Sequence, residues 1–310
     1  MGDELDTAIA VITATLRAGT PLVFAAMGEL VAERAGVLNL GIEGMMLVGA
    51  VVGFMVAATT GITPFGFVAA ALAGMAAAAI FGVLALNLMT NQVATGLALA
   101  IFGGGLAAFI GQSWVGIPLP GMELPFPEPL RQIPFVGPVL FGHDWLVYLS
   151  ILLVAGVAWF LRRTRAGLTL RAVGENQESA HALGYSVLKI RWLATLFGGA
   201  MAGIGGGYLS LIYTPQWAED MTAGRGWIAL ALVVFATWRP WRVLLGAYIF
   251  GGVTIIGLQI QAAGASLDSN LIAMTPYLAT VVVLVLISRD VTRIRLHTPA
   301  SLARPFHPEA

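Results

Sequence analysis

The chain has 310 residues, of which 58% are hydrophobic and 10% are charged, and its formal net charge is zero. A soluble domain carries roughly 25% charged residues, so this composition excludes a soluble globular protein. The sequence contains no cysteine, which excludes disulfides, thiolate metal sites and cysteine redox chemistry.

The apolar runs are continuous over about 20 residues and do not alternate with period two, so they predict membrane-spanning helices and not a β-barrel. We expect an all-α polytopic membrane protein with about nine transmembrane helices, within a range of about 8–10. In chain order the spans are 8–31, 42–60, 65–88, 93–112, 145–161, 193–213, 224–238, 242–261 and 271–288. The run 224–238 is short enough to be partly re-entrant. Residues 1–296 form one predicted transmembrane domain, and residues 297–310 a flexible, polar, proline-containing tail.

The distribution of arginine predicts the orientation, because basic residues close to span ends stay on the cytoplasmic side. The longest polar run, 162–191, is strongly basic, and so is the segment that ends the last span. Both are therefore predicted to be cytoplasmic, with the C-terminus inside and the N-terminus outside. The linker 113–144 then lies outside. It is rich in proline, which fixes φ and removes backbone donors, so we expect an extended, semi-rigid segment.

The first candidate functional run is ERAGVLNLGIEGMMLVGA, residues 33–50. Its glycines weaken helical structure between two spans, and its polar residues lie in an apolar setting. A discontinuous helix whose free backbone groups face a cavity is a common way to build a polar path through a membrane. The candidate path residues are Asn39, Gly41, Glu43 and Gly44. The alternative is a cytoplasmic corner at which Glu43 caps the N-terminus of the next helix.

Two further runs carry predictions. In the loop 162–191, Glu175–Leu183 is predicted to form a short helix that Gly184 ends, although charge alone also fits a solvated loop. In GGAMAGIGGG, residues 198–207, the four-residue spacing of Gly199, Gly203 and Gly207 predicts close helix packing. No Lys-Ser/Thr pair follows that run, so it is not a phosphate-binding loop.

The remaining polar residues predict contact surfaces and not chemistry. Trp217, Glu219 and Asp220 are expected on the outer face, where an external partner would dock. The histidines lie in loops or in the tail without a metal-ligand or nucleophile arrangement, so neither a metal site nor a catalytic site is predicted.

Three runs together carry a family resemblance: ERAGVLNLGIEGMMLVGA, LRAVGENQESAHALGYSVLKIRW and TAGRGWIALALVVFATWRP. They resemble permease subunits of type II ABC importers, in the ribose/branched-chain amino acid permease superfamily, and most of all its nucleoside branch. The resemblance covers nearly the whole chain. Glu178, Ala180 and Gly184 reproduce the E-x-A-x-x-x-G spacing of the ABC-permease coupling motif, with Ser179 where alanine is usual.

The resemblance implies the type II importer permease fold in the bacterial plasma (inner) membrane and import of nucleosides or a related small polar solute. Coupling to ATP-binding subunits would use Glu175, Glu178, Ala180 and Gly184. The other implied partners are membrane lipid, a second homologous permease in a heterodimer and an external substrate-binding lipoprotein; nucleic acid is not among them.

The chain lacks a P-loop, so we expect no enzymatic activity and no cofactor in it, with ATP and Mg²⁺ bound by the partner subunits. The alternative function is an ion-coupled secondary transporter acting without an ATPase. That class needs buried ionisable residues, and the middle spans carry almost none.

Overall fold

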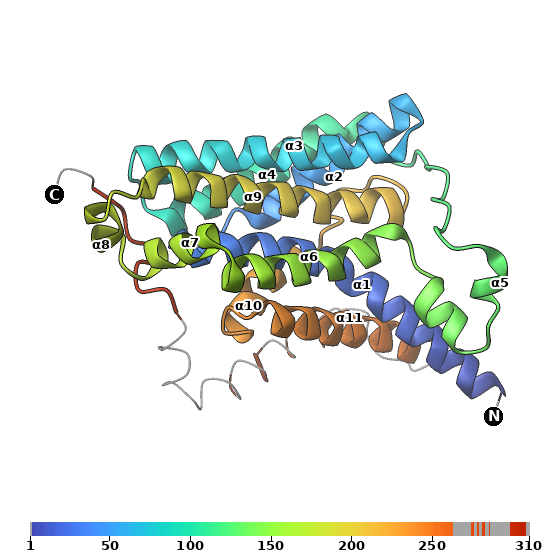
Figure 1. The fold of residues 1–310 in the computed structure, drawn as a ribbon. Coiled ribbons are helices and arrows are strands. Elements are labelled where there is room, and N and C mark those ends of the chain that lie inside the picture. The colour runs from blue at the N-terminus through green and yellow to red at the C-terminus, as the bar shows by residue number, and fades with distance from the viewer. Residues whose placement is uncertain are drawn as a thin grey trace.

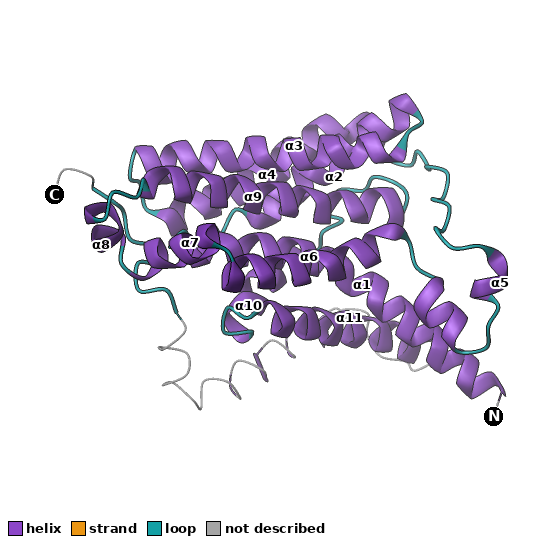
Figure 2. Ribbon diagram, in the orientation of Figure 1, coloured by secondary structure: helices purple, strands orange, loops and turns teal. Residues whose placement is uncertain are grey.

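The computed structural model describes residues 2–262 and 298–307, together with isolated positions between 274 and 285. Apart from two isolated β-bridges, the regular structure of these residues is helical (Figures 1 and 2). Seven of the described helices are long and apolar enough to cross a membrane. The prediction of an all-α polytopic protein is therefore confirmed. The predicted span 271–288 lies almost entirely outside the described residues.

The long helices are α1 (Gly2–Arg34), α2 (Ile42–Thr60), α3 (Thr63–Gly82), α4 (Gln92–Gly111), α6 (Trp145–Arg163), α9 (Val187–Tyr208) and α11 (Pro240–Ala262). The π-helical turns η1 (Val83–Asn87) and η4 (Leu209–Tyr213) extend α3 and α9. The shorter elements are η2 (Gln112–Trp114), α5 (Glu128–Arg131), η3 (Gly137–Phe141), α7 (Arg165–Glu175), α8 (Gln177–Ala182) and α10 (Arg225–Phe235). Helix α9 begins at Val187, earlier than the predicted residue 193. Arg191, in the second turn of this helix, is buried in the protein and is not part of a solvated loop.

Helix α10 does not cross a membrane. Its 11 residues span only about 16 Å at 1.5 Å per residue, against a hydrocarbon core of about 30 Å. The prediction of a full span over 224–238 is therefore wrong, and the re-entrant alternative fits. The chain enters α10 through residues 214–224 and leaves it towards α11.

The two polar connections lie at opposite ends of the helix bundle (Figure 1). Helices α7 and α8, from the basic run 162–191, lie at the end where the described chain finishes. The linker 113–144 and the N-terminus lie at the other end. This arrangement agrees with the predicted separation of the two connections. The assignment of the α8 end to the cytoplasm remains a prediction from the distribution of arginine.

The two central helices, α1 and α9, pack against each other and have different neighbours. Helix α9 also packs on α2 and α3, whereas α1 packs on α10 and α11. Each central helix is followed by a connection that turns back into the protein, 35–41 after α1 and 214–224 after α9. Since these connections start at opposite ends of the bundle, they approach each other within it.

Glycines bring α2, α3 and α9 into backbone contact. A Cβ atom placed on Gly203 would collide with the carbonyl group of Ala70 in α3, and one placed on Gly49 in α2 would collide with Gly203. Gly199 and Gly207 of α9 likewise face α3. The predicted packing role of the glycine-rich run is confirmed.

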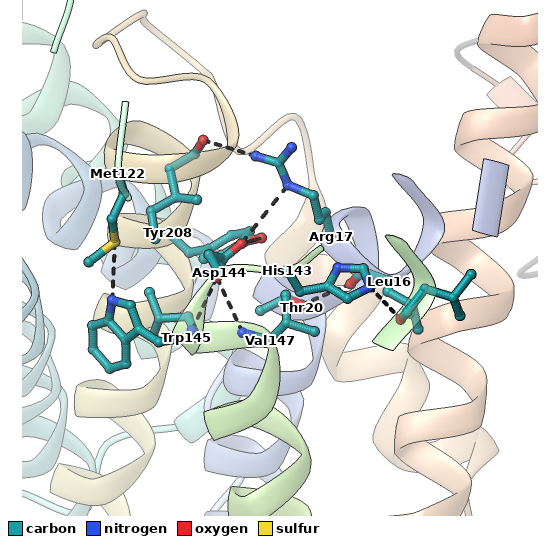
Figure 3. A network of polar contacts seen from close by, with 12 residues as sticks. Leu16, Arg17, Thr20, Met122, His143, Asp144, Trp145, Val147 and Tyr208 are labelled. Atoms are coloured by element: carbon teal, nitrogen blue, oxygen red, sulfur yellow. Dashed lines mark hydrogen bonds and ion pairs between the residues drawn. The ribbon is translucent and has the colours of Figure 1, made fainter. Parts of the chain in front are cut away.

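A buried carboxylate joins three elements at the end of the bundle that carries the N-terminus. Asp144 caps α6 by accepting hydrogen bonds from the N–H groups of Leu146 and Val147 at 3.1 and 3.2 Å. Its other oxygen accepts a hydrogen bond from the Tyr208 hydroxyl at 3.0 Å and lies 3.9 Å from Nε of Arg17. Figure 3 shows these side chains meeting from α1, α9 and the start of α6. Asp144 thus holds the end of the linker against α1 and α9 at the start of α6.

Candidate functional site: a helix start inside the bundle and a clamped surface helix

Glu43 binds the N-terminus of α10. One carboxylate oxygen accepts hydrogen bonds from the hydroxyl of Thr222 at 2.6 Å and the N–H of Gly224 at 2.9 Å. The other accepts from the N–H of Gly226 at 2.6 Å. The first N–H groups of a helix lack partners within the helix and carry its positive dipole end, so a carboxylate suits them. Glu43 therefore caps a helix, but not the one expected: it lies in the first turn of α2 and caps α10.

This contact lies well inside the bundle. Leu38 is at the level of the start of α4, because its N–H donates to the side chain of Gln92 at 2.9 Å. Gly44 is packed against Ala100 of the same helix, which is about 12 Å further along α4 at 1.5 Å per residue. Glu43 thus lies about 12 Å beyond the start of α4, a helix long and apolar enough to cross a membrane. A carboxylate at this depth needs the three donors that it has.

The fit between Glu43 and α10 depends on glycine. A Cβ atom on Gly226 would lie 2.6 Å from the backbone N and Cα of Glu43, so no larger residue fits. Gly224 has a φ of +77°, in the left-handed region that favours glycine. The contact with Glu43, which lies far away in the sequence, therefore requires glycine at positions 224 and 226.

The other predicted path residues shape the connection and do not line it. Asn39 is 2% exposed, and its side-chain oxygen accepts from the N–H of Gly41 at 2.9 Å. Gly41 and Gly44 are buried against the backbone of α4, at Gly96 and Leu99. Of the four predicted residues, only Glu43 is partly exposed. The prediction that Asn39, Gly41 and Gly44 face a path is therefore wrong, because α4 packs directly on them.

Two buried carboxylates that the sequence analysis overlooked hold connections between helices. Glu29 is 1% exposed and accepts a hydrogen bond from the N–H of Asn39 at 3.0 Å. Glu33 is fully buried and accepts from the indole N–H of Trp238, at the end of α10. Glu29 thus holds the connection between α1 and α2, and Glu33 holds the connection between α10 and α11. Two acidic residues four positions apart at the end of an apolar span were the signal that could have identified them.

The basic run 162–191 folds into two helices that meet at Asn176. The side chain of Asn176 caps α8 by accepting from the N–H of Ser179 at 2.9 Å. Gly184, with a φ of +87°, ends the turn that follows α8. The predicted helix over Glu175–Leu183 is shorter than expected, because Glu175 ends α7 and α8 covers only Gln177–Ala182. Gly184 does terminate it, as predicted.

The predicted coupling residues divide into a surface set and an anchor. Glu175, Glu178 and Gly184 are exposed, whereas Ala180 is 3% exposed and packs with Val173 and Val187. Beside them the structure exposes large apolar side chains that the sequence analysis did not single out, Leu183 at 77% and Tyr185 at 45%. They lie outside the spanning helices. Exposed apolar side chains next to α8, away from the membrane-spanning segments, are typical of a protein contact surface.

The end of the chain clamps α8, contrary to the flexible tail expected for 297–310. The carbonyl oxygen of Pro305 accepts from the side-chain amide of Gln177 at 2.9 Å. The ring of Phe306 lies 5.3 Å from that of His181 and packs on the cluster around Ala180. The N–H of Ser301 donates to the carbonyl oxygen of Gly174 at 2.8 Å. Residues 298–307 are therefore fixed by backbone and side-chain partners that composition could not reveal.

Arg191 connects this clamp to the connection that carries Glu43. Its guanidinium is 1% exposed and donates to three carbonyl oxygens: those of Ala35 at 3.2 Å, Ser301 at 3.3 Å and Arg304 at 2.9 Å. The N–H of Ala303 also donates to the carbonyl oxygen of Gly36 at 3.2 Å. These contacts connect α8, through residues 301–305 and Arg191, to residues 35–36 at the start of the connection to α2.

Comparison with known proteins shows to which family the chain belongs. Residues 11–288 match the family described as the permease component of the branched-chain amino acid transport system. The chain belongs to this family. It is the membrane-spanning permease subunit of an ABC importer, and the predicted family resemblance is confirmed.

Relatives of this permease align along most of its length. It is 41% identical to the putative glucose ABC transporter permease protein of Haloferax volcanii, over 97% of this chain and 98% of the relative. It is 31% identical to the nucleoside ABC transporter permease protein of Lactococcus lactis, over 86% and 88%. It is 30% identical to the guanosine ABC transporter permease protein of Bacillus subtilis, over 88% and 90%. Sugar and nucleoside permeases are both represented.

The predicted external docking residues of the permease do not all lie on its surface. Glu219 and Asp220 are exposed. Trp217 is 1% exposed and lies against Gly111 of α4 and the cluster around Phe54. The expectation that Trp217 forms part of a docking surface is therefore wrong, because its indole fills the space beside α2 and α4.

Proposed function

We propose that this permease forms the translocation path of an ATP-driven, binding-protein-dependent importer for nucleosides or a related small polar solute. The observation that carries the proposal is the chain of contacts from α8 to Glu43. It links an exposed surface outside the bundle to a polar group inside it, through Gln177, residues 301–305 and Arg191. A subunit that moves solute in response to a partner's ATP hydrolysis needs such a linkage.

The ATP-binding partner would dock on α8, with Glu175, Glu178 and Gly184 at the contact and Ala180 as its anchor. Leu183 and Tyr185 supply apolar area for that contact, since they are exposed outside the spanning segments. ATP and Mg²⁺ would bind in the partner. This chain would contribute movement and no catalysis.

The path would run past Glu43. This residue is only half-buried, and the neighbouring Ala223 and Trp227 at the start of α10 are exposed. The other side of such a path would come from a second homologous permease, with which this chain would form a heterodimer. Glu219 and Asp220, in the connection that leads to α10, would face an external substrate-binding lipoprotein.

The proposed solute follows from the relatives and from the character of Glu43. Nucleosides and sugars are uncharged rings that carry hydroxyl groups. The charge of Glu43 is already bound by three donors, so it is not available as a counterion for a cationic solute.

One experiment tests coupling. Leu183→Glu should reduce co-purification of the ATP-binding subunits and lower ATP-dependent uptake at least about tenfold, because it places a charge in the apolar contact. Leu5→Glu is the matched control, since Leu5 is 51% exposed near the start of α1, and the N-terminus lies at the opposite end of the bundle (Figure 1). Unchanged co-purification with Leu183→Glu would refute α8 as the docking element.

A second experiment tests the solute and the energy source. Vesicles loaded with ATP should accumulate labelled guanosine, and an ionophore should leave this uptake intact. Faster uptake of glucose than of guanosine would assign the solute to the sugars. Uptake that the ionophore abolishes at constant ATP would contradict the importer mechanism.

A further inference from the structure

Four arginines from four different elements line one pocket at the α8 end of the bundle. The pocket has a volume of about 290 Å³ and is lined by Arg34 at the end of α1, Arg162 at the end of α6, Arg171 of α7 and Arg239 between α10 and α11. Trp238 and Pro240 complete the wall on the α10 side. The pocket is separate from Glu43 and from the exposed face of α8.

The pocket concentrates positive charge. Arg34 lies close enough to Arg171 and Arg239 to be repelled by both, and the carboxylates that offset it are Glu33 and Glu175. Glu33 is also engaged with Trp238. In the part of the chain that the structure describes, Nε of Arg171 is buried and has no hydrogen-bond partner. Guanidinium groups gathered around a cavity create a local potential that attracts an anion.

Guanidinium chemistry and the position of the pocket indicate which anion fits. The planar fork of arginine matches the oxygens of a phosphate group. The pocket lies at the ends of the spanning helices α1 and α6, next to two exposed tryptophans, Trp159 and Trp241, which adjoin the lining residues Ala158 and Pro240. Exposed tryptophans of membrane proteins mark the headgroup level of the bilayer.

We propose that this pocket binds the phosphate group of an anionic phospholipid. The lipid headgroup would enter at the level of Trp159 and Trp241, and its phosphate would lie among the four guanidinium groups. A net negative headgroup is favoured over a zwitterionic one, because each basic residue near the phosphate adds attraction. The bound phosphate would hold α7 against the ends of α1 and α10. This site does not depend on the proposed solute or on docking at α8.

The test is a lipid titration of the purified full-length chain, followed by native mass spectrometry. Phosphatidylglycerol should bind about tenfold more tightly than phosphatidylcholine with the same acyl chains. The double variant Arg162→Gln/Arg171→Gln should lose about tenfold in phosphatidylglycerol affinity through its missing charge-assisted hydrogen bonds. Arg163→Gln is the matched control, because Arg163 ends the same helix, is exposed and does not line the pocket.

Each outcome decides the proposal. Equal phosphatidylglycerol affinity in the wild type and the double variant would overturn it. A loss of affinity in Arg163→Gln as large as that in the double variant would also overturn it, because the binding would then depend on diffuse positive charge and not on the pocket. Saturation of the pocket by inorganic phosphate without selectivity for phosphatidylglycerol would overturn the lipid as the source of the phosphate. Arg162→Gln alone guards against misfolding, since Arg162 is exposed, and it should still weaken binding measurably while eluting as the wild type does.

Discussion

Nε of Arg191 donates a hydrogen bond to the carbonyl oxygen of Ala35, 3.2 Å away and 156 residues earlier in the chain. We expect Arg191→Met to release the clamp on α8. Each hydrogen bond to a charged group contributes about 1.5–3 kcal/mol, partly offset by the cost of burying the guanidinium. Uptake should therefore fall, and chymotrypsin should cleave after Phe306, which packs on the cluster around Ala180, sooner than in the wild type.

The control for this prediction is Arg163→Met, which removes an exposed arginine from the end of α6. It should leave both the uptake and the cleavage rate close to those of the wild type. An Arg191→Met chain in which Phe306 resists chymotrypsin as it does in the wild type would show that the clamp does not depend on this guanidinium.

The contact between Glu43 and α10 leaves no space for a methyl group on Gly226. We expect Gly226→Ala to lower the free energy of unfolding by about 1–3 kcal/mol, the usual cost of overpacking, and to reduce uptake. Gly105→Ala is the matched control, because a Cβ atom on Gly105 meets nothing within 4 Å. Thermal unfolding of the purified chain measures the difference, and equal melting temperatures for the two variants would contradict the tight fit.

Gly184 and Gly61 offer a pair that separates coupling from stability. Both have positive φ, +87° and +70°, and a Cβ atom placed on either glycine would meet nothing within 4 Å. Proline fixes φ near −65°, so proline at either position should strain the backbone. Gly184→Pro should abolish ATP-driven uptake, whereas Gly61→Pro, at the end of α2, should retain it in proportion to the folded protein. Full uptake with Gly184→Pro would remove Gly184 from the coupling role.

His143 predicts a dependence of stability on pH. It is 1% exposed, and burial lowers its pKa below the ordinary value, although the neighbouring Asp144 and the carbonyl oxygen of Val139 oppose this effect. The folded state thus binds fewer protons than the unfolded state. The contribution of His143 is present above the unfolded pKa of about 6.5 and declines as the pH falls below it.

The measurement is the melting temperature of the wild type and of His143→Asn at about pH 7.5 and at about pH 5.5, on either side of the ordinary histidine pKa. The wild type should lose more stability on acidification, because only its unfolded state takes up a proton on residue 143 that the folded state binds less readily. Equal losses in the two proteins would assign the acid sensitivity to other groups.

The sequence predicts the helices well where an apolar run is uninterrupted, because length and hydropathy determine a span. It does not predict the depth at which a helix starts. Residues 225–235 are as apolar as their neighbours, yet α10 starts inside the bundle because Glu43, from a distant part of the chain, caps it there.

The motif that the family resemblance assigns to coupling could be located from its spacing, but its surroundings could not. Leu183 and Tyr185 read as ordinary apolar residues, and only the structure shows that they are exposed beside α8. For Trp217 the sequence predicts exposure where the structure shows burial. Its polar neighbours in the sequence indicate a surface, but the absence of a side chain at Gly111 leaves space for the indole inside the protein. Residues 298–307 are polar and contain proline, and their order comes from Arg191 and Gln177, which no local pattern reveals.

The direct contact of glycine backbones among α2, α3 and α9 restricts how this permease can change shape. Side chains between two helices can adopt new rotamers as the helices slide, but a carbonyl group lodged against a Cα atom has no rotamer to change. The contacts of Gly49 and Gly203 with each other, and of Gly203 with Ala70, would be lost on even a small slip. Helices α2, α3 and α9 would therefore move as one rigid unit in any change of shape that leaves these contacts intact.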